Sequence, residues 1–387
     1  MKKYFFSAFV MALFAIGFTA SDDDEVLVPG TPVDNTGIPS DDEAEPNPKV
    51  DAGDVTTTIP NIQVTTSDED GIYVLRIDMT GVKNPGDMEW LDLYGTGTGD
   101  NQNVWVEVDG QPKGIDVINV SDQESHEVMT DIVFTVDNSG SMGQEADAIA
   151  RDIIEWAQLL AKSHLNARFA VVGYGGYIDG AIDLTDENEL NSYLNYSSGT
   201  YRTMHFGGSN ADQLQAWAGA WTRTSSGVSS NECGAMAIKF ANEYFSFRTG
   251  ANRIYINFTD EPNQPNGIES YSVKFFENQI NWPSTFGTVH TVYSDYQFSS
   301  NSWNYSEQPW LISEYTGGTT LFIQSNASDL NLSTITVTEA MQHSYIIRLH
   351  GMASMINDGK VHEVHVTILS KDGSVKADKS FEIMFNV

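Results

Sequence analysis

In the middle of the chain, strand-like apolar runs alternate with segments of helical periodicity, and this alternation constrains the fold more than any other feature. The first pair is clear, because residues 131–136 are largely apolar and the apolar positions between Ala146 and Ala161 recur every three or four residues. Such spacing predicts a helix with one apolar face. Strands alternating with helices favour a mostly parallel sheet covered on both faces. We therefore predict a doubly wound α/β domain over residues 129–343.

The same alternation continues along the domain. Further strands are predicted at 168–174, 253–258, 287–293 and 320–323, with a hairpin at 177–184 and helices at 186–193, 211–220, 233–247, 271–280 and 307–315. A pattern of this kind is typical of doubly wound sheets.

On both sides of this domain the pattern changes to short runs with a period of two. Residues 55–128 contain alternating segments such as 72–77 and 104–108, and Asp-Gly turns separate similar segments in residues 344–387. Alternation with Asp-Gly turns indicates antiparallel strands. We predict β-rich N-terminal and C-terminal regions that pair into one sandwich, with the α/β domain inserted between them.

The first residues read as an export signal followed by a linker. Lysines precede an apolar run at 5–18, which is shorter than the roughly 20 residues that span a bilayer, and small residues follow it. This arrangement predicts a signal peptide over residues 1–20. Residues 21–54 are rich in acidic residues and proline without periodicity, so we predict a linker. After removal of the signal we expect no integral membrane segment, and a protein that is secreted or held at the cell surface or envelope.

The acidic run at 21–25 resembles the stretch that follows the acylated cysteine in surface lipoproteins of Bacteroidetes-type bacteria. That cysteine is missing here, so the resemblance implies an exported protein without lipid attachment at this point. Cys233 is the only cysteine, which excludes an intramolecular disulfide and leaves stability to packing. The formal charge of −33, from 53 acidic and 20 basic residues, argues against nucleic acid as a partner.

The end of the first apolar strand carries oxygen donors at alternate positions. Asp137, Ser139 and Ser141 stand there, in a loop ahead of the helix. One carboxylate and two hydroxyls suit Mg²⁺, Mn²⁺ or Ca²⁺. Ligands bind open α/β sheets outside the carboxyl ends of the strands, where this loop lies. We predict a divalent metal site, with Mg²⁺ as the first choice.

The run from Asp131 to Met142, which contains Asp137-Asn-Ser-Gly-Ser141, resembles the start of a von Willebrand factor A (VWA) domain. The metal-ion-dependent adhesion site of that family has the pattern Asp-x-Ser-x-Ser. Strand 254–258 is followed by Thr259-Asp260, which matches the family's Thr-Asp after its fourth strand. The resemblance covers about residues 129–343. It implies a VWA fold and Asp260 as the second carboxylate of the metal site.

A third loop departs from the commonest form of the family, in which a threonine supplies an oxygen. The helix near Cys233 is preceded by Ser229-Ser230-Asn231-Glu232. This run resembles the variant in integrin β chains, where a glutamate takes the place of the threonine. We favour Glu232 as the metal ligand over Ser229 or Ser230. Ser209 also imitates the threonine form, but its spacing fits less well.

The function that the site implies is binding. A metal held by one carboxylate, serines and waters keeps a net positive charge and can take a carboxylate from a partner. We expect a metal-dependent adhesion or protein-binding module whose partner presents an Asp or Glu carboxylate. An accessory subunit of an envelope complex and a structural or tip component of a pilus-like polymer remain alternatives. No catalytic motif is evident, so we expect no enzyme and no catalytic residue.

Several residues near the predicted loops could either contact a ligand or have no functional role. Ser229, Ser230, Glu261 and Tyr177 are candidates for contact with the ligand, although polar loops are more often only solvated. Tyr174 and Tyr201 are further candidates for the rim of the site.

For two other residues we prefer an interpretation without a functional role. We interpret Cys233 as a buried filler and Asp183 as surface charge.

Overall fold

The computed structural model describes residues 34–59, 61–69, 71–96, 101–120, 129–162, 166–204, 232–278, 280–294, 306–335, 337–351 and 354–385. Those from Thr36 onward belong to one compact unit. The predicted signal peptide, residues 21–33 of the predicted linker and the predicted helix at 211–220 lie outside the described residues.

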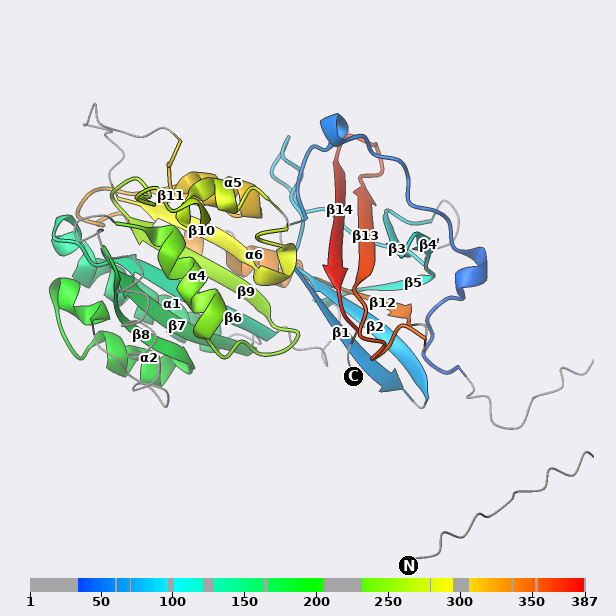
Figure 1. Ribbon diagram of the computed structural model, residues 1–387, viewed down its shortest axis with the longest axis horizontal. Coiled ribbons are helices and arrows are strands. Elements are labelled where there is room, and N and C mark those ends of the chain that lie inside the picture. Colours follow the sequence, from blue (N-terminus) through cyan, green and yellow to red (C-terminus); the bar gives the residue numbers. More distant parts are fainter. Residues whose placement is uncertain are drawn as a thin grey trace, which may run out of the picture. The chain divides into compact units, whose positions relative to one another are not determined.

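A six-stranded sheet forms the centre of the α/β domain (Figure 1). Its strands, in spatial order, are β11 (Thr320–Phe322), β10 (Thr288–Tyr293), β9 (Asn252–Thr259), β6 (Met129–Asp137), β7 (Asn166–Tyr174) and β8 (Ile178–Thr185). All neighbours are parallel except β7 and β8, which form an antiparallel hairpin. The mostly parallel sheet confirms the predicted fold class.

Helices cover both faces of this sheet. They are α1 (Ala146–Ala161), α2 (Glu187–Leu194), α4 (Gly234–Tyr244), α5 (Trp310–Thr316) and α6 (Val337–Gln342), with short 3-10 turns η4 (Ser141–Gly143), η5 (Gly199–Thr203), η6 (Glu269–Tyr271), η7 (Val273–Phe275), η8 (Ser284–Phe286) and η9 (Leu332–Thr334). In the described part of the chain, no helix is both long and apolar enough to cross a membrane.

The alternation of side chains along β6 builds two apolar layers. Phe134 packs in one buried cluster with Ile153 of α1, and Val133 packs in the other with Phe240 of α4. Successive side chains of a strand point to opposite faces, so a strand buried on both faces must be apolar throughout. This packing fixes the carboxyl end of β6, where Asp137 stands, between two helices.

The predicted helix at 271–280 is wrong. The described residues of this segment form only the turns η6 and η7. The Ser272 hydroxyl accepts a hydrogen bond from Lys274 N at 3.3 Å, and the Glu307 carboxylate accepts one from Val273 N at 3.0 Å. Side-chain acceptors of this kind compete with helical hydrogen bonds. Glu307 is more than thirty positions away in sequence, so local periodicity does not reveal it.

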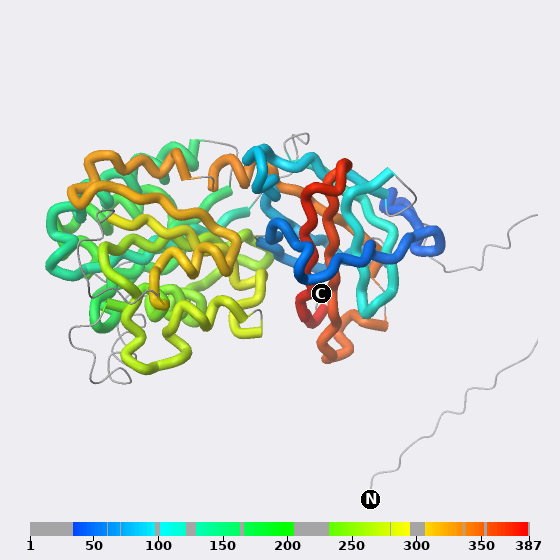
Figure 2. The backbone as a smooth tube through the Cα atoms, turned by 90° about the horizontal axis from the view of Figure 1, so that it is seen from above, coloured from blue at the N-terminus to red at the C-terminus, as the bar shows by residue number. Residues whose placement is uncertain are grey.

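Two four-stranded antiparallel sheets form the second part of the unit. Their strand orders are β1 (Ile62–Glu69), β2 (Ile72–Met79), β12 (Tyr345–His350), β5 (Ile115–Asn119) and β14 (Lys376–Ile383), β13 (His362–Leu369), β3 (Val104–Val108), β4 (Gln111–Pro112). Both sheets contribute to one buried cluster, as expected of a β-sandwich. Each sheet contains strands from before and from after the α/β domain, and Figure 2 shows the red C-terminal strands beside blue and cyan N-terminal segments.

Residues 36–54 of the predicted linker contact the sandwich and include the turns η1 (Asp41–Glu43) and η2 (Ala52–Asp54). The Asp41 carboxylate pairs with the buried Lys113 ammonium. The Asn47 backbone N–H donates to Glu107 Oε1 at 2.8 Å. The segment adds no strand to either sheet, which is why it lacks apolar alternation, yet specific polar contacts hold it.

Candidate metal centre

Three loops meet at the carboxyl ends of two neighbouring strands. Asp137 is the last residue of β6, Asp260 follows β9, and Glu232 lies two positions before α4. One carboxylate oxygen from each of the three side chains lies within 4.8 Å of the others. Parallel strands end at the same edge of a sheet, so the pairing of β6 with β9 brings the first two together. This carboxylate cluster could hold a metal ion.

The two serines predicted from the first loop lie between these carboxylates. Ser139 N donates to Asp137 Oδ1 at 2.8 Å, and the hydroxyls of Ser139 and Ser141 are 2.9 Å apart. Ser141 Oγ in turn donates to Asp260 Oδ1 at 3.2 Å. The structure therefore brings Asp137, Ser139, Ser141 and Asp260 into one continuous hydrogen-bonded chain, and Glu232 lies beside it.

Thr259 orients the first carboxylate from the neighbouring strand. Its hydroxyl donates to Asp137 Oδ2 at 3.1 Å and accepts from Glu261 N at 3.2 Å. Both Asp137 oxygens are thus engaged, because Ser139 N holds the other. The sequence interpretation used Thr259 only as part of a Thr-Asp pair and missed this positioning role.

Burial and mutual repulsion destabilise the ionised form of these three carboxyl groups. Asp137 is 1% exposed, and burial raises its pKa to about 7, with a further contribution from the charge of Asp260. Burial also raises the pKa of Glu232 to about 8, helped by the charges of Asp137, Glu261 and Asp260. Glu232 Oε2 accepts no hydrogen bond from the described residues. A hard divalent cation would relieve both the burial and the repulsion, since all the donors are oxygens.

A packed contact between strand and helix positions Glu232. The first residue of α4 is Gly234, where an added Cβ would lie 2.7 Å from Asn257 Oδ1 of β9. Asn257 cannot easily move, because its Oδ1 accepts from Thr135 Oγ1 at 2.8 Å and from Tyr174 OH at 3.0 Å. The glycine therefore lets α4 begin close to the sheet. Tyr174 is fully buried in this contact, so the prediction that it lies on the rim is wrong.

Asn138 links the first loop to the opposite side of the site. Its Nδ2 donates to Asp179 Oδ2 at 2.8 Å, and its Oδ1 accepts from Thr203 Oγ1 at 2.9 Å. Two other predicted rim residues lie nearby in sequence, with Tyr177 44% exposed before β8 and Tyr201 67% exposed in η5. Their rings are available to a partner.

The remaining contact candidates divide into two groups. Glu261 is half-buried, and its charge helps to raise the pKa of Glu232, which places it next to the cluster. Ser229 and Ser230 lie outside the described residues, as does Ser209.

Glu145 is a buried acid that the sequence interpretation missed. It precedes α1, is 1% exposed, and its Oε1 accepts from Ser294 Oγ at 2.7 Å. Burial raises its pKa, and the charge of Asp260 adds to the shift. Next to Ser294, the Tyr293 hydroxyl donates to Asp260 O at 2.7 Å. The end of β10 therefore fixes both the start of α1 and the Asp260 loop. No sequence pattern marks this contact.

We interpreted Cys233 and Asp183 as residues without a functional role, and the structure confirms the environment expected for only one of them. The prediction that Cys233 is buried is confirmed, since it is 2% exposed and burial raises its pKa to about 12. The interpretation of Asp183 as surface charge is wrong. Asp183 is 7% exposed and accepts from Ser246 N at 2.9 Å and from Ser246 Oγ at 2.8 Å.

Comparison with known proteins gives distant likenesses to solved structures. No family model and no curated protein sequence matches the chain. One similar solved structure is an aerotolerance-related membrane protein from Bacteroides fragilis with multiple mutations to serines, at 14% identity over 55% of this chain and 98% of that chain, with a TM-score of 0.33. Another is the human COPII-coat protein Sec24c, at 9% identity over 88% of this chain and 58% of that chain, with a TM-score of 0.30. The assignment of the fold rests on the sheet and its helices.

Proposed function

We propose that the chain is an exported adhesion or protein-binding module of the VWA type, which binds its partner through a divalent metal ion, Mg²⁺ in the first place. The observation that carries the proposal is the convergence of Asp137, Glu232 and Asp260, whose carboxylate oxygens lie within 4.8 Å of one another. The hydroxyls of Ser139 and Ser141 complete an all-oxygen donor set of the kind that Mg²⁺, Mn²⁺ and Ca²⁺ prefer.

The charge of the cluster decides how the metal would act. Three directly bound carboxylates would leave a divalent ion with a net negative charge, which would not attract a further anion. We therefore assign Asp137, Ser139 and Ser141 as direct ligands, and Asp260 and Glu232 as groups that hold metal-bound water. In this arrangement the ion keeps a positive charge and can bind an Asp or Glu carboxylate of a protein partner. We propose a binding role for this site.

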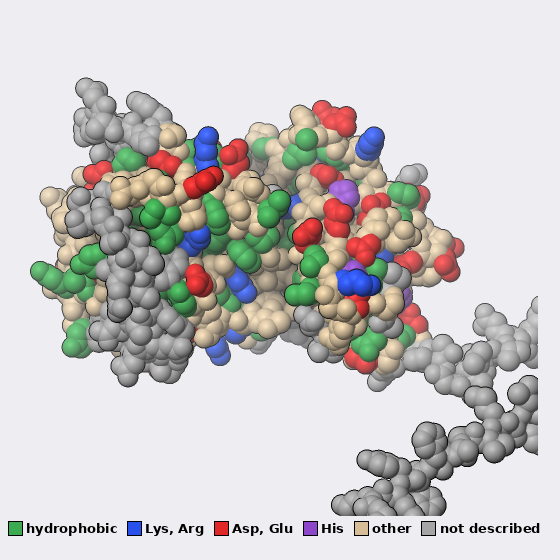
Figure 3. Space-filling model, in the orientation of Figure 1, with side chains coloured by type: hydrophobic (Ala, Val, Ile, Leu, Met, Phe, Trp, Pro, Cys, Tyr) green, Lys and Arg blue, Asp and Glu red, His purple; other side chains and the backbone are tan. Residues whose placement is uncertain are grey.

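The negative charge of the rest of the molecule repels an acidic partner at long range. The chain carries a formal charge of −33, and Figure 3 shows acidic side chains spread over the sandwich on the face in view. Charge repulsion slows the approach of an acidic partner, and salt screens it over about 10 Å at 0.1 M. We expect the association rate to rise with salt, which stopped-flow mixing with an acidic peptide would measure.

Localisation is the second part of the proposal. The lysines and apolar run of residues 1–18 support export through a signal peptide. Expression of the full chain followed by fractionation and N-terminal sequencing tests it, since a mature protein that begins near residue 21 is expected outside the cytoplasm.

Metal titration tests the site directly. The chain, freed of metal with EDTA, is titrated with Mg²⁺, Mn²⁺ and Ca²⁺ by calorimetry, and an array of Asp- and Glu-containing peptides is probed in Mg²⁺ and in EDTA. We expect metal-dependent capture that Asp137→Ala abolishes. Asp116→Ala is the control, because it removes only a surface ion pair with Arg348 in the sandwich. Equal peptide capture in EDTA and Mg²⁺ would refute the proposal.

A further inference from the structure

A buried polar pair lies close to the carboxylate cluster along the chain. Asn263 follows Asp260 in the loop after β9, and Glu307 precedes Trp310, the first residue of α5. Asn263 is 4% exposed and Glu307 is 7% exposed. Asn263 N donates to Glu307 O at 2.9 Å, and Asn263 Nδ2 donates to Glu307 Oε2 at 2.9 Å. The Asn263–Glu307 pair therefore ties the loop that carries Asp260 to the segment ahead of α5.

The Asn263 side chain also reaches the residues that follow Glu232. Its Oδ1 accepts from Ala235 N at 3.2 Å and from Cys233 Sγ at 3.3 Å. The first backbone N–H groups of a helix have no acceptor within the helix, and the side chain of Cys233, at the N-cap of α4, forms no capping bond. Asn263 supplies the acceptor from a distant segment.

The next residue of the same loop holds Glu232 directly. Gln264 N donates to Glu232 O at 2.8 Å. The loop that carries one acid of the carboxylate cluster, Asp260, thus also fixes the backbone of another. The separation of Asp260 and Glu232 therefore depends on how firmly this loop is held.

Further hydrogen bonds anchor the Asn263–Glu307 pair. Glu307 Oε2 also accepts from Val273 N at 3.0 Å, and Glu307 Oε1 accepts from the Ser272 hydroxyl. Asn263 Nδ2 also donates to Tyr271 O at 2.8 Å. Hydrogen bonds to an ionised carboxylate are stronger than those between neutral groups, and a buried carboxylate requires them. The pair is therefore held by the segment 271–273 as well as by its own two hydrogen bonds.

We propose that Asn263 and Glu307 are positioning residues that set the affinity of the metal centre by holding Glu232 at its distance from Asp260. A shift of the segment ahead of α5 would then change the affinity. The inference rests on the metal-dependent function proposed above. Groups that touch a metal ligand change the affinity about 10–100-fold when they are removed, and this pair acts one contact further away, so we expect about three- to tenfold.

Two substitutions of Glu307 separate its hydrogen bonds from its charge. Glu307→Gln keeps an oxygen that can accept from Asn263 Nδ2 and Val273 N, and its amide can donate to Ser272 Oγ, whereas Glu307→Ala removes all three contacts. Electron paramagnetic resonance of Mn²⁺, titrated into the full chain freed of metal, measures the affinity. We expect Glu307→Ala to weaken Mn²⁺ binding about three- to tenfold and Glu307→Gln to retain it.

Asp183→Ala is the matched control. Asp183 is also a buried carboxylate, 7% exposed, and it accepts from the backbone N–H and the hydroxyl of Ser246. Ser246 follows the other end of α4, away from the carboxylate cluster. We expect Asp183→Ala to lower the stability to urea as Glu307→Ala does, and to leave the Mn²⁺ affinity unchanged.

Alkylation of Cys233 tests the coupling without any variant. Cys233 is the only cysteine, and it is 2% exposed with its Sγ bonded to Asn263 Oδ1. It can react only when this contact opens. If opening weakens metal binding, bound metal must oppose opening by the same factor. We therefore expect saturating Mn²⁺ to slow alkylation of the unaltered chain by iodoacetamide about three- to tenfold relative to EDTA.

The outcomes separate this inference from the proposed function. Absence of Mn²⁺ binding by the unaltered chain would refute the metal-dependent function and this inference with it. If the chain binds Mn²⁺, an unchanged affinity in Glu307→Ala overturns this inference alone, and so does an equal loss in Asp183→Ala or in Glu307→Gln. Equal alkylation rates of Cys233 in saturating Mn²⁺ and in EDTA overturn it as well.

Discussion

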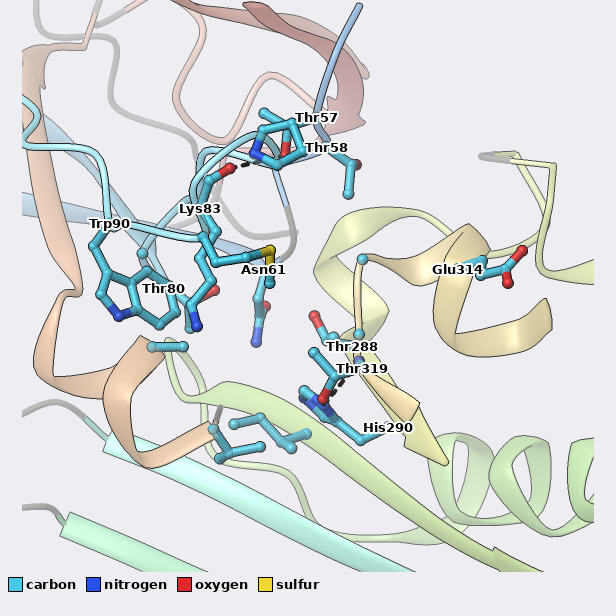
Figure 4. A pocket seen from close by; sticks show the side chains of 18 residues that line it. Thr57, Thr58, Asn61, Thr80, Lys83, Trp90, Thr288, His290, Glu314 and Thr319 are labelled. Atoms are coloured by element: carbon cyan, nitrogen blue, oxygen red, sulfur yellow. Dashed lines mark hydrogen bonds between the residues drawn. The ribbon is translucent and has the colours of Figure 1, made fainter. Parts of the chain in front are cut away.

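The two edges of the central sheet differ in the charge of the groups that they leave without partners. At the carboxyl edge, burial raises the pKa values of Asp137 and Glu232, and Glu232 Oε2 accepts no hydrogen bond from described residues. At the amino edge, the buried groups without partners among the described residues belong to neutral side chains, such as those of Asn61 and Thr288 (Figure 4), and to Nε of Arg253, and none of them is an acid. Buried acids without a full set of partners are thus found, among the described residues, at the carboxyl edge.

This difference decides which edge a cation should occupy. Buried like charges are relieved by a cation, whereas neutral donors and acceptors are satisfied by neutral hydrogen-bonding groups. Chelation should therefore affect only the carboxyl edge.

The largest expected effect comes from removing the charge of Asp137. Asp137→Asn keeps the size of the side chain and should weaken Mg²⁺ binding by about 100-fold or more, because a direct ligand usually matters at least as much as its supporting groups. Calorimetry with Mg²⁺ measures the affinity. An unchanged affinity would mean that Asp137 is not a direct ligand.

A buried charge away from both edges tests the effect of burial alone. Lys379 in β14 is 9% exposed, and burial lowers its pKa to about 8. The folded state therefore disfavours the charged ammonium, so stability should be lowest below about pH 8 and should rise towards pH 10.5, the ordinary value for lysine. Lys379→Met should remove this slope and add roughly 1–3 kcal/mol at neutral pH. Urea unfolding at several pH values measures it, and a persistent slope of the same size in the variant would contradict the assignment.

Close packing at Gly234 offers a steric test of the carboxyl edge. Gly234→Ala places a Cβ 2.7 Å from the held Asn257 side chain, so it should cost about 1–3 kcal/mol and displace Glu232. Urea unfolding and metal titration measure the two effects. Gly140→Ala is the control, because Gly140 lies in the first loop with φ −66° and no atom within 4 Å of an added Cβ. Equal destabilisation by both substitutions would count against the packing argument.

The smallest effect is expected from the residue that orients Asp137. Thr259→Val removes the hydrogen bond to Asp137 Oδ2 and should reduce metal affinity about tenfold, with a loss of stability of about 1 kcal/mol. Metal titration and urea unfolding measure these changes, with Thr130→Val as the control, because Thr130 is a buried threonine of β6 whose hydroxyl has no partner among the described residues. An unchanged metal affinity would show that Asp137 needs no support from β9.

How far the sequence predicts the fold depends on how local the determining interactions are. The helix α1 has the predicted bounds, Ala146–Ala161, because its apolar positions are set by neighbours one turn away. The predicted helix at 271–280 fails because a carboxylate from Glu307 binds the backbone there. Polar partners that arrive from distant segments leave no periodic trace.

For the metal centre, the sequence predicted the residues that are close together in the chain, but not the contacts between distant segments. Asp137, Ser139 and Ser141 could be predicted together because the strand and loop alone place them within a few residues. Asp260 and Glu232 were predicted only through the family resemblance. The support from Thr259 and Glu145 was not predicted, because each reaches its partner across a strand or helix boundary.

The sequence by itself determined most of the succession of strands and helices, apart from the segment 271–280, and the oxygen-rich loop after β6, because periodicity and loop chemistry depend on residues close together in the chain. Only the tertiary structure decided which acids lie within 4.8 Å of one another and how far burial shifts their pKa values. It also brought Asn61 and Thr288, which are more than two hundred positions apart, to the lining of one cavity (Figure 4). The burial of these acids and the distances between them depend on how distant segments pack, so a local stretch of sequence does not reveal them.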